Sequence, residues 1–155
     1  MKENLKGIYF FSIIFLIVDQ VLKVFISSKI MLNQSFILIK NLLSVTLVHN
    51  TGAAFSILSD SRLLLVVIGI LALIGISFYI NSLDYISGTD TFIYSLLIGG
   101  VLGNLIDRII HGFVIDYINF QFFGYNFPVF NFADICIVIS IVLIIVNTIK
   151  GDLWN

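Results

Sequence analysis

Four long apolar segments constrain the fold of this chain more than any other feature. They cover residues 7–28, 63–80, 91–109 and 132–149, and each approaches the roughly 20 residues that a helix needs to cross a bilayer. Charged residues make up 11% of the chain and its mean hydropathy is +1.11, whereas soluble domains carry about 25% charge. The sequence therefore predicts an all-α integral membrane protein. Its four transmembrane helices would form a single domain over residues 1–155, with both termini on the same side.

The connections between these segments differ in kind. Residues 29–61 are long and semi-apolar, and residues 36–39 and 45–49 are rich in β-branched or aromatic side chains, which predicts a small strand-containing platform between the first two helices. We expect the platform to lie at the membrane surface, because an open sheet would leave backbone groups unpaired in lipid. By contrast, residues 81–90 read as a short polar turn and residues 111–131 as a loop.

The first apolar segment follows Lys2 and Lys6, an arrangement also found in secretory signal peptides. No small-residue cleavage site comes after it, so the sequence predicts a retained first span with a cytoplasmic N-terminus. The single cysteine, Cys136, lies in an apolar run and is interpreted as a buried small hydrophobe. His49 and His111 have no partners at metal-ligand spacing, so no metal site is predicted.

Four aspartates lie at the edges of the apolar segments: Asp19, Asp107, Asp116 and Asp134. Ionisable groups at membrane depth are expensive and are retained mostly where they serve a function. The first helix ends, the third ends and the fourth begins on one face, so we expect the four aspartates to converge near one membrane surface. Asp116 and Asp134 flank a short connection, and two carboxylates that share a proton can activate water for hydrolysis. This pair is the leading candidate for an active site.

Two of the aspartates also have structural interpretations. Asp19 and Lys23 are four residues apart, the favourable order for a helical ion pair. Either the pair is structural, with Lys23 extending its ammonium group to the interface, or it contacts substrate or tunes the site. Asn131 and Asp134 have the spacing of a helix N-cap followed by an acid at the third helical position. Such a cap favours ionised Asp134, so Asp116 would carry the shared proton more often.

The third apolar segment contains two polar and small-residue stripes. One consists of Ser95, Gly99, Gly103 and Asp107, and the other of Gly100, Asn104 and Arg108. The glycines predict a close-packing face for another helix rather than a phosphate-binding loop. In the platform, the small residues between Asn50 and Ser56 either open the backbone to an extended peptide or form a plain turn.

Taken together, five motifs resemble the lipoprotein signal peptidases, or signal peptidase II. They are Asp19-Gln-x-x-Lys23, Asn50-x-Gly-Ala-Ala-Phe, Gly103-Asn104-x-x-Asp107-Arg108, Val114-x-Asp116 and Phe130-Asn131-x-Ala133-Asp134. The resemblance implies a bacterial membrane aspartic endopeptidase that removes the signal peptide from prolipoproteins, cutting just before a diacylglyceryl-modified cysteine. It implies no cofactor, no metal and no nucleic acid, membrane lipids as partners, and a monomer.

The resemblance also assigns roles to residues. Asp116 and Asp134 fall on the catalytic positions. The remaining motif positions would bind substrate or support the site: Asp19, Lys23, Asn50, Gly52, Asn104, Asp107, Arg108, Asn131 and Ala133. We further expect Lys23 to balance the charge of Asp19, and Arg108 that of Asp107.

The orientation in the membrane does not follow from charge alone. Once Lys23 and Arg108 are set aside as site residues, three basic residues (Lys2, Lys6 and Lys150) oppose three others (Lys29, Lys40 and Arg62) across the membrane, so the positive-inside rule favours neither orientation. The resemblance places both termini in the cytoplasm and the site towards the outer face of the cytoplasmic membrane. It also makes residues 29–61 a surface cradle for the substrate.

Two other functions fit the sequence less well. An ion- or proton-coupled transporter could use the aspartates and Lys23 as a relay, but transporters usually place such groups near the midplane between inverted repeats, and no repeat is visible here. A structural subunit would leave the converging polar residues without a purpose. Nucleophilic proteolysis is disfavoured, because no serine lies in a Gly-x-Ser-x-Gly context with a histidine.

Overall fold

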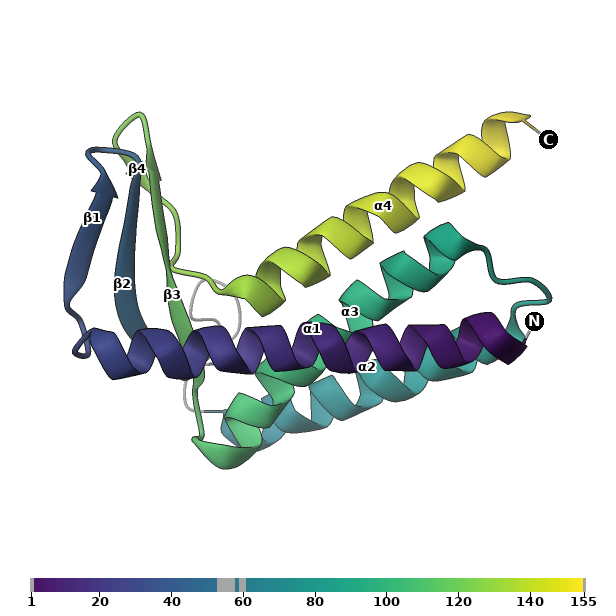
Figure 1. The fold of residues 1–155 in the computed structure, drawn as a ribbon, viewed down its shortest axis with the longest axis horizontal. Coiled ribbons are helices and arrows are strands. Elements are labelled where there is room, and N and C mark those ends of the chain that lie inside the picture. Colours follow the sequence, from purple (N-terminus) through teal and green to yellow (C-terminus); the bar gives the residue numbers. More distant parts are fainter. Residues whose placement is uncertain (1, 53–57, 59–60, 155) are drawn as a thin grey trace.

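The four predicted helices are present in the computed structural model, which describes residues 2–52, 58 and 61–154. They are α1 (Lys2–Lys29), α2 (Arg62–Ser82), α3 (Gly88–Ile110) and α4 (Phe132–Trp154). Within the described residues, these four are long and apolar enough to cross a membrane, and each predicted span lies inside one of them. Both termini lie at one end of the molecule and the sheet lies at the other (Figure 1).

Helix α3 is the most buried of the four, and its glycines explain how the others approach it. A Cβ atom on Gly99 would lie 2.7 Å from the Phe15 Cβ of α1, and one on Gly100 would lie 2.6 Å from the Ala133 carbonyl oxygen of α4. Real Cβ atoms essentially never come within 3.0 Å of such atoms, so only glycine lets these helices pack at this distance. The predicted packing role of the two stripes is confirmed.

Apolar and polar burial separate along the helices. Near the termini, a cluster that includes Ile8, Ile80 and Tyr94 forms an apolar core. Towards the sheet, the buried side chains include Asp19, Lys23 and Asp107. The polar end of the helix bundle therefore faces the sheet.

The sheet is antiparallel with strand order β1-β2-β3-β4. Strands β1 (Ser35–Ile39) and β2 (Leu43–Asn50) come from the predicted platform, and β3 (Val114–Phe122) and β4 (Tyr125–Asn126) come from the connection between α3 and α4. The prediction of a loop over residues 111–131 was therefore wrong. Nine of these residues form β3, which becomes a strand because β2 supplies its hydrogen-bonding partner.

Pairing between β2 and β3 sets the position of Asp116. Val48 lies opposite Asp116 and Asn50 lies opposite Val114, so Asn50 and Asp116 are diagonal neighbours on one face of the sheet. At the other end of β3, Phe123 and Gly124 connect Phe122 to Tyr125 and both have positive φ values, 47° and 80°. This is the two-residue hairpin geometry that matches the twist of the flanking strands.

Candidate active site

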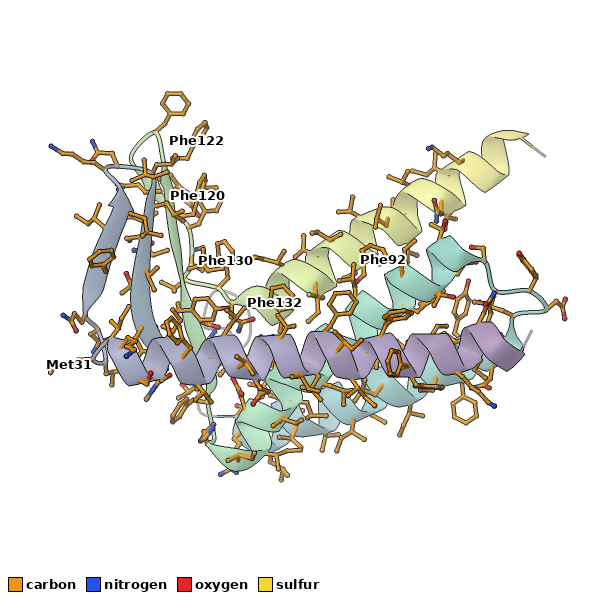
Figure 2. All side chains as sticks on the ribbon, in the orientation of Figure 1. Met31, Phe92, Phe120, Phe122, Phe130 and Phe132 are labelled. Carbon is orange, nitrogen blue, oxygen red and sulfur yellow. The ribbon has the colours of Figure 1, made fainter. Side chains whose placement is uncertain are left out.

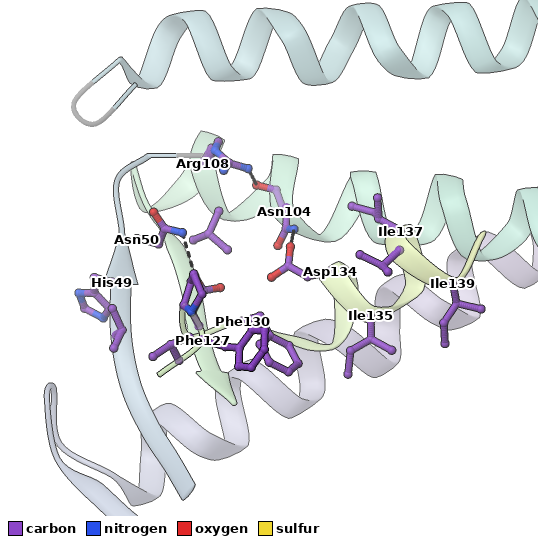
Figure 3. A pocket seen from close by; sticks show the side chains of 16 residues that line it. His49, Asn50, Asn104, Arg108, Phe127, Phe130, Asp134, Ile135, Ile137 and Ile139 are labelled. Carbon is purple, nitrogen blue, oxygen red and sulfur yellow. Dashed lines mark hydrogen bonds between the residues drawn. The ribbon is translucent and has the colours of Figure 1, made fainter. Parts of the chain in front are cut away.

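A cavity of about 730 Å³ lies between the sheet, α3 and the start of α4. Its wall is mostly apolar and includes Phe127–Phe130 and several isoleucines of α4. In Figure 3, the polar side chains of Asn50, Asn104, Arg108 and Asp134 lie near one another, and Ile135, Ile137 and Ile139 continue away from them along α4. Asp116 also lines the cavity, so the two predicted catalytic carboxylates lie in the wall of the same cavity.

Asp116 lies on β3 and is 2% exposed. Its two carboxyl oxygens each accept a hydrogen bond from an asparagine, Oδ2 from Asn50 Nδ2 at 2.9 Å and Oδ1 from Asn131 Nδ2 at 2.7 Å. Burial, and then the nearby charge of Asp134, raises the pKa of Asp116 to about 7. Asp116 can therefore hold a proton near neutral pH.

Asp134 lies in the first turn of α4, where the predicted cap is confirmed. Its Oδ2 accepts the Asn131 backbone N–H at 3.0 Å, and the Asn131 Oδ1 accepts the Asp134 backbone N–H at 2.9 Å. Its other oxygen accepts a hydrogen bond from Asn104 Nδ2 at 2.8 Å. The carboxyl group thus lies at a helix N-terminus, where a negative charge is favoured.

Asn131 and Asn104 connect the two aspartates. Asn131 Nδ2 donates to the Asn104 Oδ1 at 3.0 Å as well as to Asp116. A continuous hydrogen-bonded path therefore runs from Asp116 through Asn131 and Asn104 to Asp134. Because every link is a short side-chain contact between buried or half-buried groups, the relative placement of the two carboxylates is fixed.

Lys23 lies behind this path. Its expected pairing with Asp19 is confirmed, whereas its expected extension to the interface and the expected balance of Asp107 by Arg108 were wrong. Lys23 does not extend to the interface, because it is 1% exposed. It also balances both supporting aspartates, with its Nζ 2.8 Å from Asp19 and 2.9 Å from Asp107. Within the described part of the chain, Arg108 makes no ion pair with Asp107. Its guanidinium donates instead to the carbonyl oxygens of Gly52 and Asn104.

The other predicted site residues also lie near this network. Gly52 is buried, and its N–H donates to the Asn50 Oδ1 at 2.9 Å. Ala133 is fully buried, next to Asp134. The small residues Ala53–Ser56 lie outside the described residues. His49 and His111 stack against Phe113, and among the described residues no group of three histidine, cysteine or acidic side chains could hold a metal ion.

Sequence reasoning assigned no role to two parts of the site. Gln20 donates to Asp19 at 3.2 Å and to Asp107 at 3.0 Å, and its position beside Asp19 within an apolar segment could have identified it. The apolar wall formed by residues 127–130 and by α4 carries no signal of its own, because its side chains are ordinary hydrophobic residues.

Comparisons with known proteins agree on one family. The family model described as Signal peptidase (SPase) II matches residues 11–150. The lipoprotein signal peptidase of Staphylococcus aureus (strain bovine RF122) is 41% identical over 135 residues, which is 86% of this chain and 82% of that protein. That of Staphylococcus epidermidis (strain ATCC 12228) is 40% identical over 145 residues, 93% of this chain and 89% of the relative.

A solved structure gives the same result for the fold. A bacterial membrane enzyme determined in meso at 2.3 Å resolution superposes with a TM-score of 0.87 and 34% sequence identity, over 94% of this chain and 88% of that one. The match of the family model to nearly the whole span from α1 to α4, together with these relatives, establishes that the chain belongs to the signal peptidase II family.

Proposed function

We propose that this protein is a membrane aspartic endopeptidase that cleaves the signal peptide from diacylglyceryl-modified prolipoproteins, just before the lipidated cysteine, and that residues 1–155 act as one peptidase domain. The observation that carries the proposed chemistry is the pair Asp116 and Asp134, which line one largely apolar cavity. Asp116 has a pKa of about 7, and Asp134 lies in the first turn of α4, where the helix N-terminus favours a carboxylate. One acid and one base at neutral pH are what proton transfer in both directions requires.

The mechanism follows from these two states. Ionised Asp134 removes a proton from a water molecule, whose oxygen attacks the scissile carbonyl carbon. Protonated Asp116 donates a hydrogen bond to the carbonyl oxygen and then transfers its proton to the leaving amide nitrogen. The C–N bond breaks, no covalent enzyme intermediate forms, and proton exchange with water resets the pair.

The cavity wall suits a substrate that remains anchored in lipid. Val138 and Ile139 of α4 both line the cavity and remain exposed on the helix surface, at 60% and 43%. On a membrane-spanning helix, such side chains face acyl chains. We infer that the lipidated end of the substrate reaches the carboxylates along this face of α4.

Cleavage should therefore depend on the lipid. With purified enzyme in detergent micelles, a prolipoprotein carrying the diacylglyceryl group should be cleaved with a kcat/KM about 100-fold or more above that of the same chain without it, because binding energy from a remote group contributes to catalysis. Mass spectrometry of the products gives both the rate and the cut position. Equal rates on the two substrates, or a cut elsewhere than before the cysteine, would contradict the proposed substrate.

We place both termini in the cytoplasm and the sheet at the outer face of a bacterial cytoplasmic membrane, with the protein as a monomer of 17.4 kDa. The termini and the sheet lie at opposite ends of the molecule (Figure 1), so a sheet at the outer face goes with termini in the cytoplasm. The β3–β4 hairpin, with Phe122 near the free tip of the sheet (Figure 2), supports lipid contact. Phe123 is 94% exposed and Tyr125 is 57% exposed. No charged residue occurs between Asp116 and Asp134, and aromatic side chains favour the bilayer interface.

Cysteine labelling tests this placement. In a Cys136→Ser background, Tyr125→Cys should react with a membrane-impermeant maleimide added to intact cells. Asp84→Cys, on the turn between α2 and α3, should react only after permeabilisation. A lipid-soluble maleimide should favour Tyr125→Cys over Asp84→Cys, because the hairpin tip would lie among lipid headgroups. If Asp84→Cys reacts in intact cells and Tyr125→Cys does not, the orientation is wrong. If the lipid-soluble maleimide labels both variants equally, the proposed lipid contact is wrong. Light scattering on the purified protein tests whether it is a monomer.

A further inference from the structure

Asp19, Lys23 and Asp107 lie next to the carboxylate pair but do not line the cavity. We propose that these three residues act as one positioning unit. The unit fixes the relative positions of Asp116 and Asp134 through hydrogen bonds to the backbone N–H of the residue that precedes each of them. The inference rests on the proposed function, because it takes Asp116 and Asp134 as the reacting pair. The three residues do not line the cavity and act on the reacting pair through the backbone and through Asn104, so they are positioning residues.

The first of these backbone hydrogen bonds holds the start of α4. Asp19 Oδ1, from α1, accepts the backbone N–H of Ala133 at 3.0 Å, across 114 residues of sequence. Ala133 is the residue before Asp134. The amides of the first helical turn have no acceptor within their own helix, so Asp19 completes the cap that Asn131 begins. A carboxylate from a neighbouring helix thereby fixes the helix start that carries Asp134.

The second backbone hydrogen bond holds β3, and its acceptor is again an aspartate from another element. Asp107 Oδ2, from α3, accepts the backbone N–H of Ile115 at 3.0 Å, and Ile115 is the residue before Asp116. Each reacting aspartate is therefore held by a second aspartate, through the amide of the residue that precedes it. One of these hydrogen bonds is made to a helix and the other to a strand, so local secondary structure cannot explain why both reacting aspartates are held in the same way.

Lys23 connects the two aspartates that accept these backbone hydrogen bonds. Its ammonium contacts Asp19 at 2.8 Å and Asp107 at 2.9 Å, and it donates to the Asn104 Oδ1 at 3.1 Å. Because an ammonium has only donors, Asn104 must turn its oxygen towards Lys23. Its Nδ2 is then directed to Asp134. Lys23 thus sets the distance between the two supporting carboxylates and also the orientation of the amide that contacts a reacting one.

The burial of this unit favours a geometric role over a stabilising one. Asp19 is 0% exposed, and Lys23 and Asp107 are each 1% exposed. Buried ion networks generally stabilise a fold no better than apolar residues of similar volume, and can be worse. Three buried charges that together hold two backbone amides at defined positions are instead suited to fixing where Asp116 and Asp134 point.

Alanine and asparagine variants separate these roles. Asp19→Ala and Asp107→Ala remove the acceptor, so we expect kcat to fall about 100-fold with KM within about twofold, because small displacements of reacting groups slow chemistry without weakening binding. Asp19→Asn and Asp107→Asn retain an oxygen that can accept the same N–H but lose the ion pair with Lys23. They should lose less activity than the alanine variants and stay within about tenfold of wild-type kcat. Ser12→Ala is the matched control, because Ser12 is a buried polar residue of α1 whose hydroxyl donates to Ile8 of its own helix.

A second readout distinguishes positioning from general destabilisation. Asp107→Ala should also move the descending limb of the pH profile, because it frees the strand that carries Asp116, whereas Ser12→Ala should not. Folded alanine variants with wild-type kcat, or losses that simply follow melting temperature in alanine and asparagine variants alike, would overturn the proposal. If the alanine variants do not fold, the asparagine variants decide, because a folded one with a loss of about 100-fold contradicts the acceptor role.

Failure of this proposal can be distinguished from failure of the proposed function. If Asp116→Asn or Asp134→Asn remains active, the reacting pair itself is wrong. If both are inactive while folded Asp19→Ala and Asp107→Ala cleave normally, only the positioning unit is wrong.

Discussion

Asp116→Asn and Asp134→Asn should each reduce kcat for cleavage of a diacylglyceryl-modified prolipoprotein by about 1,000-fold or more, because an amide can neither supply nor accept the proton that each step transfers. The replacement has the same size, and its one carbonyl oxygen keeps one of the two hydrogen bonds that each carboxyl accepts at 2.7–3.0 Å. The loss should therefore appear in kcat rather than in folding. Single-turnover cleavage with saturating enzyme measures it directly.

The matched control is Asp84→Asn, which makes the same chemical change on the turn between α2 and α3 and should leave cleavage unchanged. The double variant Asp116→Asn/Asp134→Asn should be no slower than the slower single variant, because residues that act as a unit lose their effect together. If either single variant folds with a wild-type melting temperature and cleaves at a near wild-type rate, the assignment of the pair is wrong.

The pH profile of the wild-type enzyme tests the separate roles of the pair. Asp116 must be protonated to act as the acid, and its pKa is raised to about 7. The proton is therefore present below pH 7 and lost above it, so kcat/KM should fall about tenfold per pH unit on the alkaline side. A rate that keeps rising through pH 8 would show that Asp116 does not work in its protonated form.

Gly100→Ala should produce the second large effect, on both folding and cleavage. The new Cβ would lie 2.6 Å from the Ala133 carbonyl oxygen and 2.9 Å from the Ile137 Cγ1. Because the first of these is backbone, α4 must move as a whole, and overpacking of this kind destabilises by about 1–3 kcal/mol. The part of α4 that moves carries Asp134, so cleavage should fall further than the melting temperature alone would explain.

Gly75→Ala provides the control for this substitution. Gly75 lies in α2, and nothing lies within 4 Å of the position its Cβ would take. Alanine is the better helix former by about 0.5–1 kcal/mol, so this variant should melt at or above the wild-type temperature and cleave normally. If the two glycine variants melted alike, the close contact between α3 and α4 would not limit stability.

Local sequence was sufficient for much of the site. The link between Asn131 and Asp134 spans three residues within one chain segment, so its capping geometry follows from spacing alone. The glycine stripes of α3 could also be predicted, because a helical repeat places every fourth residue on the same face. The pair of Asp116 and Asp134 was a candidate from its position at the edges of apolar segments, and the motif resemblance assigned it the catalytic role. That role stays a prediction that the variants above will test.

The sequence by itself determined the four spanning helices, because lipid offers no hydrogen-bond partners and an apolar segment of that length must satisfy its backbone internally. Only the tertiary structure decided that residues 114–122 form a strand and that Lys23 is buried. A strand needs a partner, and β3 finds it in β2, more than sixty residues away in sequence. Lys23 can remain buried only because Asp107, from another helix, joins Asp19 beside its ammonium. Both features depend on contacts between distant segments, which the pattern within either segment does not contain.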